Sequence, residues 1–422
     1  MYLATCSEEA VKIIKSNDRV YIQAAAAAPQ LLINAMSDKH EELRNVEVCH
    51  LHLEGETPYA NSELRNSFHV NSFFIGHNVR HTLTAGNGSY TPVFLSELPL
   101  LFKRNIVALD VAMIHVSVPD KHGYCSLGVS IEATLAAIAN AKVVIAQVNK
   151  QMPRTHGDGL IHISEINSFV ECDIPLPTLN FDAPSETENK IANFIANLIE
   201  DRSTLQMGIG NIPNAVLSKL IHHKDLGLHT EMFSDGVIDL ILNDVITGNY
   251  KSINPGRTLA TFLMGSKRLY DYVDDNPFIE MRASDYVNDV SVIKQNRHMI
   301  AINSAIEVDV TGQVCADSIG AKMYSGVGGQ MDFIRAASLS EGGKAIIALP
   351  SITKKGVSRI VPTLNPGAGV VTTRSHVHFV VTEYGVANLY GKTIKERVKA
   401  LTDIAHPNHR EYIDKTYFEL IH

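Results

Sequence analysis

Hydrophobic and polar positions alternate along the chain in a way that predicts strands and helices in turn. The apolar run Val107–Val118 predicts a buried strand, and Ile131–Ala141 after it has the alanine-rich pattern of a helix. Lys142–Val148 then predicts a second strand. Strand, helix and strand in this order are typical of a parallel sheet covered by helices, so we expect an α/β protein with mostly parallel sheets.

The segment Ile174–Ser185 interrupts this pattern and indicates a domain boundary. It reads IPLPTLNFDAPS, with three prolines and little periodicity. A helix is predicted directly after it, because Ser185 and Glu188 have the spacing of a capping box and apolar residues recur behind them at helical spacing. We therefore predict an N-terminal α/β domain over residues 1–180 and a C-terminal α/β domain over residues 185–422.

The composition of the 422-residue chain is that of a protein with large cores. Hydrophobic residues make up 45% of the chain and charged residues 19%, a balance that does not fit disorder. The 37 Lys and Arg residues against 45 Asp and Glu residues give a net charge of −8, which argues against a protein that binds nucleic acid through its phosphates. An anionic ligand must therefore be held by local groups rather than by the overall field.

The cysteines and the N-terminal region predict a cytoplasmic protein with no membrane segment. The five cysteines are odd in number and show no CxxC spacing, so we expect reduced thiols. Residues 1–12 contain Glu8 and Glu9 and lack the apolar core of a signal peptide. The most hydrophobic early stretch, Val20–Met36, is interrupted by polar residues and a proline, so it does not predict a membrane helix.

A glycine turn stands between a predicted strand and a predicted helix. The run Gln206–Pro213 reads QMGIGNIP, and its backbone N–H groups would receive an anion at the positive end of the helix. A tight turn that only needs small residues is the other interpretation. A dinucleotide site is disfavoured, because Pro213 stands where the third glycine of GxGxxG belongs.

Glu231 lies in the run His229–Gly236, between a predicted strand at Leu226–Thr230 and a predicted helix at Val237–Leu242. This order places Glu231 near the carboxyl end of a strand, where open α/β sheets bind their ligands. We expect that strand to neighbour the one that leads into the glycine turn. A solvated loop glutamate is the alternative interpretation, because a single Glu forms no motif by itself.

A second glycine cluster, Gly326–Gln330, reads GVGGQ and allows a ligand to approach the backbone closely. A flexible loop is the alternative. His50, His52 and Glu54 share one face of a predicted strand, but an ordinary strand explains that run and we expect no metal site. No nucleophile motif of the GxSxG kind occurs in the chain.

Taken together, these segments resemble the acetyl-CoA hydrolase/transferase family, a branch of the class I CoA-transferases. Within it the chain is most similar to butyrate and 4-hydroxybutyrate CoA-transferases, and the resemblance covers nearly the whole chain. So many long matches in the same order are highly specific. The matching segments are Ser117–Thr134, Gln147–Ile166, Gln206–Val216, His229–Leu240, Met264–Pro277, Val308–Gly320, Gly326–Phe333 and Val380–Lys392.

The resemblance implies two CoA-transferase-type α/β domains, assembled as a homodimer. It implies transfer of CoA from a short-chain acyl-CoA (acetyl-, butyryl- or 4-hydroxybutyryl-CoA) to a carboxylic acid such as acetate, by a ping-pong mechanism through a glutamyl-CoA thioester. It assigns the nucleophile to Glu231 and the oxyanion-stabilising amides to Met207, Gly328 and Gly329. No cofactor is implied beyond the substrate coenzyme A. The residues that it places against CoA are Gly208, Ile209, Gly210, Asn211, Ile212, Ile306, Gly326, Gln330 and Lys354.

Two other functions stay open at this point. An acyl-CoA hydrolase would use the same glutamate, with water in place of the second acid. A non-catalytic CoA-sensing protein would keep the glycine loops but would not need Glu231. The chain departs from the common family pattern at Ala336, where glycine is common, and at Tyr390, where a basic residue is frequent. These departures concern the acyl pocket and the loop shape rather than the nucleophile.

Overall fold

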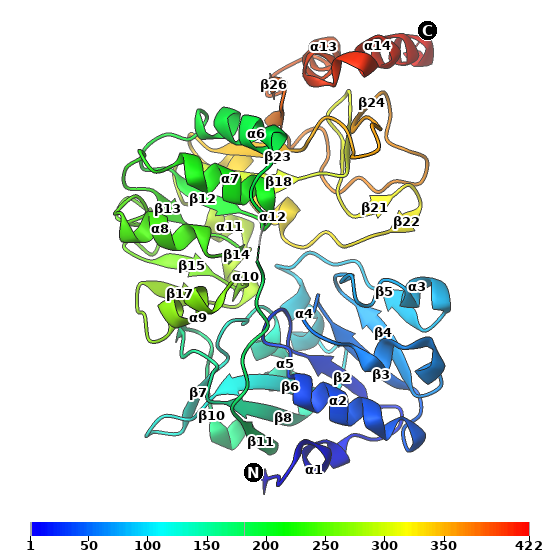
Figure 1. Ribbon diagram of the computed structural model, residues 1–422, viewed down its shortest axis with the longest axis vertical. Coiled ribbons are helices and arrows are strands. Elements are labelled where there is room, and N and C mark those ends of the chain that lie inside the picture. Colours follow the sequence, from blue (N-terminus) through cyan, green and yellow to red (C-terminus); the bar gives the residue numbers. More distant parts are fainter. Residues whose placement is uncertain (1, 181, 422) are drawn as a thin grey trace. The chain divides into compact units, whose positions relative to one another are not determined.

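The computed structural model describes residues 2–180 and 182–421, which form two compact units (Figure 1). The first unit combines the chain up to residue 180 with residues 259–287. The second unit combines residues 182–258 with residues 288–421. Each unit has its own sheet and its own buried apolar core.

The first unit is built on an eight-stranded sheet in which all neighbouring strands are parallel. The predicted strand at Val107–Val118 is β6, one of the two longest strands and almost entirely buried, which explains its continuous apolar sequence. In sheet order the strands are β1 (Tyr2–Leu3), β11 (Ser168–Cys172), β8 (Ala141–Asn149), β6 (Leu109–Ser117), β2 (Arg19–Ile22), β3 (Val46–His50), β4 (Phe68–Ser72) and β5 (Gly88–Tyr90).

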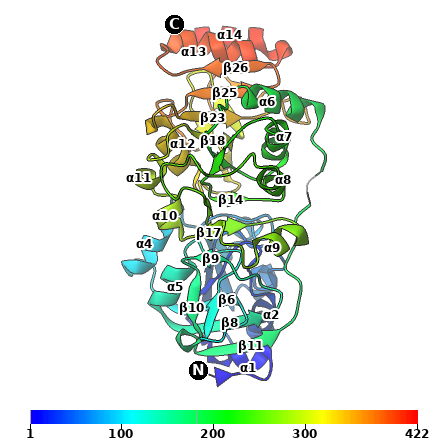
Figure 2. The same ribbon diagram turned by 90° about the vertical axis from the view of Figure 1, so that its left-hand side faces the viewer.

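Helices cover both faces of this sheet, as a parallel sheet requires. Figure 2 shows α4 and α5 on one side of the strands and α1 and α2 on the other. The alanine-rich segment forms α5, which is shorter than predicted and buries Ala136 and Ala137. The α-helices of this unit are α1 (Ser7–Ala10), α2 (Gln30–Asp38), α3 (Thr82–Ala85), α4 (Leu98–Lys103), α5 (Thr134–Asn140), α9 (Lys267–Val273) and α10 (Ser284–Val287).

Residues 259–287 fall in the first unit, whereas the sequence prediction assigned them to the C-terminal domain. The backbone explains this difference. The N–H of Ile131 donates to the Thr261 carbonyl at 2.9 Å, and the N–H of Leu263 donates to the Val129 carbonyl at 2.8 Å. Strand β17 (Ile279–Met281) also pairs in parallel with β9 (His156–Gly157). The N-terminal unit is therefore completed by a later part of the chain.

The second unit contains a six-stranded sheet that is parallel except at one edge, where β25 and β26 run antiparallel. Together with the first sheet it confirms the predicted α/β class with mostly parallel sheets. In sheet order the strands are β13 (Gly227–Leu228), β12 (Thr204–Met207), β18 (Met299–Ser304), β23 (Lys344–Ala348), β25 (Phe379–Thr382) and β26 (Gly385–Asn388).

The helices of the second unit also lie on both faces of its sheet. Figure 2 shows α7 and α8 on one side of β18 and β23, with α11 and α12 on the other. The predicted capping box starts α6, because the Glu188 N–H donates to Ser185 Oγ at 3.3 Å and Glu188 Oε2 accepts from the Ser185 N–H at 2.7 Å. The helices are α6 (Glu186–Ala196), α7 (Asn211–Lys219), α8 (Gly236–Leu242), α11 (Val290–Ile293), α12 (Gln330–Leu339), α13 (Ile394–Ile404) and α14 (Pro407–Ile421).

Candidate functional site

Glu231 lies in a bend between β13 and β14 (Met232–Phe233), at the carboxyl end of the edge strand of the second unit's sheet. Strand β13 is shorter than the predicted Leu226–Thr230. It pairs in parallel with β12, which leads into the glycine turn, so the predicted neighbouring strands are confirmed. The Glu231 side chain is half-buried.

Two donors hold the Glu231 carboxylate. The buried Asn288 side chain donates from Nδ2 to Glu231 Oε2 at 2.9 Å, and the Gly329 backbone N–H also donates to the carboxylate. A Cβ atom at position 329 would lie 1.9 Å from Glu231 Oε2 and 2.1 Å from Asn288 Nδ2. Only glycine therefore permits this close approach of the start of α12 to Glu231.

Burial raises the pKa of Glu231 to about 7, against the lowering effect of the hydrogen bonds from Asn288 and Gly329. Burial acts in this direction because it destabilises the charged form of a carboxyl group. A carboxyl group that titrates near neutrality, next to fixed hydrogen-bond donors, can serve as an ionised nucleophile or exchange protons.

Thr230 ties the glycine turn to the segment that carries Glu231. The buried Thr230 Oγ1 accepts a long hydrogen bond from the Met207 N–H at 3.3 Å. The same hydroxyl lies 3.1 Å from the Met207 carbonyl and 2.9 Å from the Met232 carbonyl, both of which accept from it. Met207, predicted as an oxyanion donor, is thereby bound to the side chain of Thr230, the residue that directly precedes Glu231.

The glycine turn opens onto a cavity of about 250 Å³. Gly210, which immediately precedes α7, has φ = 122° and ψ = −177°, a conformation essentially restricted to glycine. Four residues predicted to contact CoA line this cavity, together with Glu188 and Arg359, which the sequence analysis did not select. The predicted four are Ile209, Gly210, Asn211 and Ile212.

The other predicted residues lie on separate segments of the second unit. Gly328 adopts φ = 56°, and Gln330 begins α12 with its side chain donating to Thr372 Oγ1 at 3.3 Å. Gly326 precedes them in the same loop. Ile306 connects β18 to β19 (Glu307–Asp309), and its N–H donates to the Cys315 carbonyl at 2.8 Å. Lys354 is exposed, and its charge helps to lower the pKa of Glu188.

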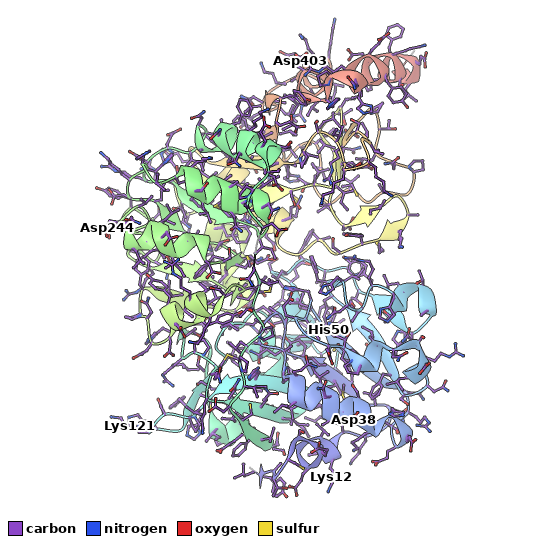
Figure 3. The ribbon with its side chains drawn as sticks, viewed as in Figure 1. Lys12, Asp38, His50, Lys121, Asp244 and Asp403 are labelled. Carbon is purple, nitrogen blue, oxygen red and sulfur yellow. The ribbon has the colours of Figure 1, made fainter. Side chains whose placement is uncertain are left out.

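The histidines considered for metal binding belong to the core of the first unit. His50, labelled in Figure 3, contacts the Tyr59 hydroxyl through Nε2 at 2.9 Å, and burial lowers its pKa to about 4. The His52 ring packs edge-on against Phe74 and Phe262. Over residues 2–180 and 182–421, no group of three or more His, Cys, Asp or Glu side chains is arranged to hold a metal ion.

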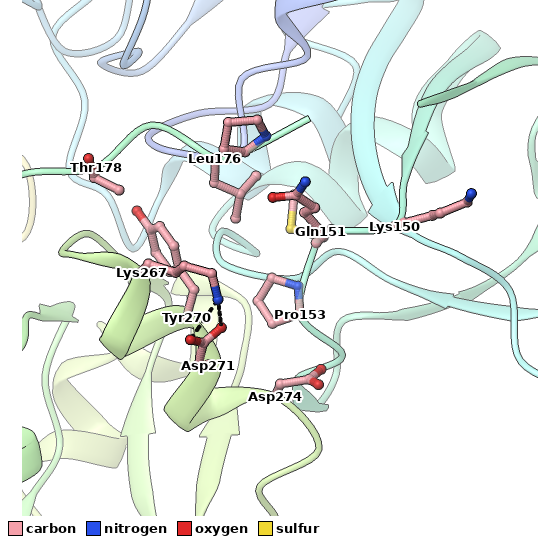
Figure 4. Close-up of a pocket in the computed structure, with 11 residues that line it drawn as sticks. Lys150, Gln151, Pro153, Leu176, Thr178, Lys267, Tyr270, Asp271 and Asp274 are labelled. Atoms are coloured by element: carbon pink, nitrogen blue, oxygen red, sulfur yellow. Dashed lines mark hydrogen bonds and ion pairs between the residues drawn. The ribbon is translucent and has the colours of Figure 1, made fainter. Parts of the chain in front are cut away.

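A larger cavity, of about 450 Å³, lies within the first unit and is shown in Figure 4. Lys267 and Asp271 form an ion pair on its wall, and Tyr270 and Lys150 also line it. None of the predicted site residues contributes to this cavity.

In the described part of the chain, every helix is too short or too polar to cross a membrane.

Comparisons with known proteins show which family the chain belongs to. Residues 2–179 match a family model described as the acetyl-CoA hydrolase/transferase N-terminal domain, and residues 265–417 match the model of the C-terminal domain of the same family. The second match begins inside the segment that packs with the first unit, so the family boundary does not coincide with the division of the structure.

Two curated relatives align over almost the whole chain. A succinyl-CoA:acetate/propanoyl-CoA:succinate CoA transferase of Fasciola hepatica is 48% identical over 99% of this chain and 88% of its own. A 4-hydroxybutyrate coenzyme A transferase of Clostridium kluyveri is 48% identical over 96% of this chain and 95% of its own. Among solved structures, RipA of Yersinia pestis superposes with a TM-score of 0.94 at 34% identity, over 99% of this chain and 97% of its own.

Proposed function

Because the chain belongs to the acetyl-CoA hydrolase/transferase family, we propose that it transfers CoA from a short-chain acyl-CoA to a carboxylic acid, with Glu231 as the covalent nucleophile. One observation carries the proposal. The half-buried Glu231 carboxyl group has a pKa raised by burial to about 7, and it accepts hydrogen bonds from Asn288, at Oε2, and from the Gly329 amide that opens α12.

The reaction begins when a carboxylate oxygen of Glu231 attacks the thioester carbon of the acyl-CoA. The carbon–sulfur bond breaks and leaves an acyl-glutamyl anhydride and the CoA thiolate. The thiolate then attacks the glutamyl carbonyl carbon and releases the first acid as its carboxylate. The enzyme now holds a glutamyl-CoA thioester, and a second carboxylate takes up CoA by the reverse sequence, which gives ping-pong kinetics.

Asn288 and Gly329 have a defined task in the second half of this sequence. In the glutamyl-CoA thioester, Oε2, the oxygen that Asn288 contacts in the free carboxylate, becomes the thioester carbonyl oxygen, with the Gly329 amide beside it. Negative charge develops on that oxygen when a nucleophile attacks the carbonyl carbon. Donors already in position stabilise such an oxyanion by about 3–4 kcal/mol each, because they need no reorganisation during the reaction.

Positioning has to supply the rest of the acceleration, because a carboxylate is a weak nucleophile. Well-oriented attack within one complex can lower the barrier by roughly 7–11 kcal/mol. The bonds that fix Glu231, and the Thr230 hydroxyl that joins β12 to its segment, supply this orientation. Binding of the CoA nucleotide and pantetheine, remote from the reacting atoms, contributes further. The sequence of steps uses no cofactor other than CoA, and we place it in the cytoplasm and in a homodimer.

Trapping of the intermediate tests this function. The enzyme is incubated with acetyl-CoA or butyryl-CoA and reduced with borohydride, and its peptides are examined by mass spectrometry. Reduction should convert Glu231 to the corresponding alcohol, and the Glu231→Gln variant should lose transfer by at least about 10³-fold. An active enzyme whose Glu231 remains unmodified would exclude the mechanism. Comparing CoA release with and without acetate separates transfer from hydrolysis.

A further inference from the structure

Tyr390, one of the two departures from the common family pattern, presents its ring at the surface of the second unit. The side chain is 67% exposed, and its ring lies against that of His378, with the centroids 4.2 Å apart and the planes tilted by 42°. The proposed reaction does not use this aromatic pair. An exposed ring of this kind offers a flat face to a second aromatic system, such as a nucleobase.

Arg397, on α13, joins the loop that carries Tyr390 to the segment that carries Arg374. Its Nη1 donates to the Arg374 carbonyl at 2.5 Å. A Cβ atom at Gly312 would stand 3.1 Å from Leu389 Cδ1 and 3.9 Å from the Arg374 Cα, and the same point lies 3.2 Å from Arg397 Nη1. The loop after β26 and the segment before β25 therefore lie side by side.

Positive charge gathers at these two segments. Arg374 and, on α12, Arg335 are exposed, and Arg397 is half-buried. Within residues 2–180 and 182–421, none of these three guanidinium groups forms an ion pair with a carboxylate. Burial and then the charge of Arg374 lower the pKa of Arg397, and burial and then the charge of Arg335 lower the pKa of His376. The cations therefore act on one another and on their neighbours at close range.

The acidic side chains of these segments do not neutralise the arginines. Residues 371–399 contain two of them, Glu383 and Glu396. Glu383 accepts from the Ser351 N–H at 2.9 Å and from the Ser351 hydroxyl at 2.6 Å. Glu396 pairs with Lys392 at 3.7 Å. A bound polyanion would supply the counter-charge that the protein itself does not provide, and would relieve the repulsion between like charges.

We propose that this surface binds a nucleoside di- or triphosphate, with its base stacked on Tyr390 and its phosphates held by Arg374 and Arg335. The planar fork of arginine matches phosphate oxygens in pairs, and aromatic stacking supplies the contact with the base. The net charge of −8 disfavours a nucleic acid with many phosphates, whereas a single nucleotide needs only local groups. The site uses neither Glu231 nor the glycine turn, so the inference does not depend on the proposed reaction.

Calorimetric titration of the full-length protein with ATP and with tripolyphosphate tests the proposal. The wild-type protein should bind both. Tyr390→Ala should weaken ATP binding by about 10-fold, because the stacking face is lost, and should leave tripolyphosphate binding unchanged. Arg374→Gln should weaken the binding of both ligands by about 10-fold, because both lose a charged hydrogen-bonding partner. Tyr390→Phe should bind ATP as the wild type does, since it keeps the ring.

Tyr412→Ala and Arg104→Gln are the matched controls. Tyr412 is 62% exposed on α14, and Arg104 is an exposed arginine of the first unit. Both variants should bind ATP and tripolyphosphate with the wild-type dissociation constants. Thermal unfolding of every variant should show the wild-type midpoint, because the substituted side chains are exposed.

Three results would overturn the proposal. The first is the absence of ATP binding at millimolar concentration, or ATP binding that neither Tyr390→Ala nor Arg374→Gln weakens. The second is an equal loss of ATP and tripolyphosphate binding in Tyr390→Ala, which would remove the base from that ring. The third concerns the acyl-CoA site. Arg374→Gln should keep the wild-type KM for acetyl-CoA, and a rise in that KM by the same factor as the ATP dissociation constant would make the surface part of the acyl-CoA site.

Discussion

At the scale of single residues, the ionisation of Glu231 depends on two opposing effects. Burial favours the neutral carboxyl group, and the donors from Asn288 and Gly329 favour the carboxylate. The outcome is a pKa of about 7, well above that of an ordinary glutamate. A less acidic carboxyl group is a better nucleophile once ionised, but a larger fraction of it is protonated at neutral pH.

The pH dependence of transfer follows from this balance. Attack requires the ionised form, so kcat/KM should fall on acidification below about pH 7, by roughly tenfold per pH unit. In Asn288→Ala a bond that lowers the pKa is lost, so the acidic limb should move to higher pH and kcat should also fall. The measurement is kcat/KM against pH for both proteins.

Asn303→Ala is the control for that profile. Its side chain donates to Gln206 Oε1 at 2.9 Å and makes no contact with Glu231 in the described structure, so the limb should stay in place. A limb that stays in place in Asn288→Ala as well would mean that another group, and not Glu231, sets the acidic side of the profile.

At the scale of elements, the sequence predicted the segments of the proposed site but not how their side chains are held. The sequence predicted three elements correctly, because each depends on residues close together in sequence. These are the glycine turn, the strand before Glu231 and the capping box of α6. Asn288 and Arg359 were missed. Neither belongs to a local motif, and each is placed beside the proposed site by contacts that include a residue 57 or 54 positions away.

The glycine that opens α12 gives a sharp element-scale prediction. In Gly329→Ala the new Cβ would overlap Glu231 Oε2 and Asn288 Nδ2, so the carboxylate must move or the helix must shift. Displacing reacting groups by about 1 Å can cost roughly 10²-fold in rate. We expect kcat to fall by about that factor, with a smaller change in KM. Transfer assays together with thermal unfolding test this. A variant of wild-type kcat would show that α12 does not approach Glu231 this closely.

At the scale of the whole molecule, no pattern in the sequence indicates that one unit is assembled from two stretches of chain. A proline-rich boundary near residue 180 is a local signal, and the first unit does end its first stretch there. The return of residues 259–287 is not local. It depends on strand pairing between residues more than a hundred positions apart, such as Glu280 and His156. The hydrophobic pattern within 259–287 does not indicate which strand this segment pairs with.

This discontinuity predicts how fragments of the protein behave. Phe262, Met264, Ile279 and Met281 are each 5% exposed or less, and His52 contacts both Phe262 and Met264. Burying four such side chains is worth roughly 6–12 kcal/mol, which is as much as the net stability of a typical domain. The fragment 1–180 should therefore fail to unfold cooperatively. The same fragment joined by a flexible linker to residues 259–287 should recover a cooperative transition, followed by circular dichroism during heating. If the short fragment alone melted as sharply as the joined one, residues 259–287 would be an appendage of the first unit and not part of its core.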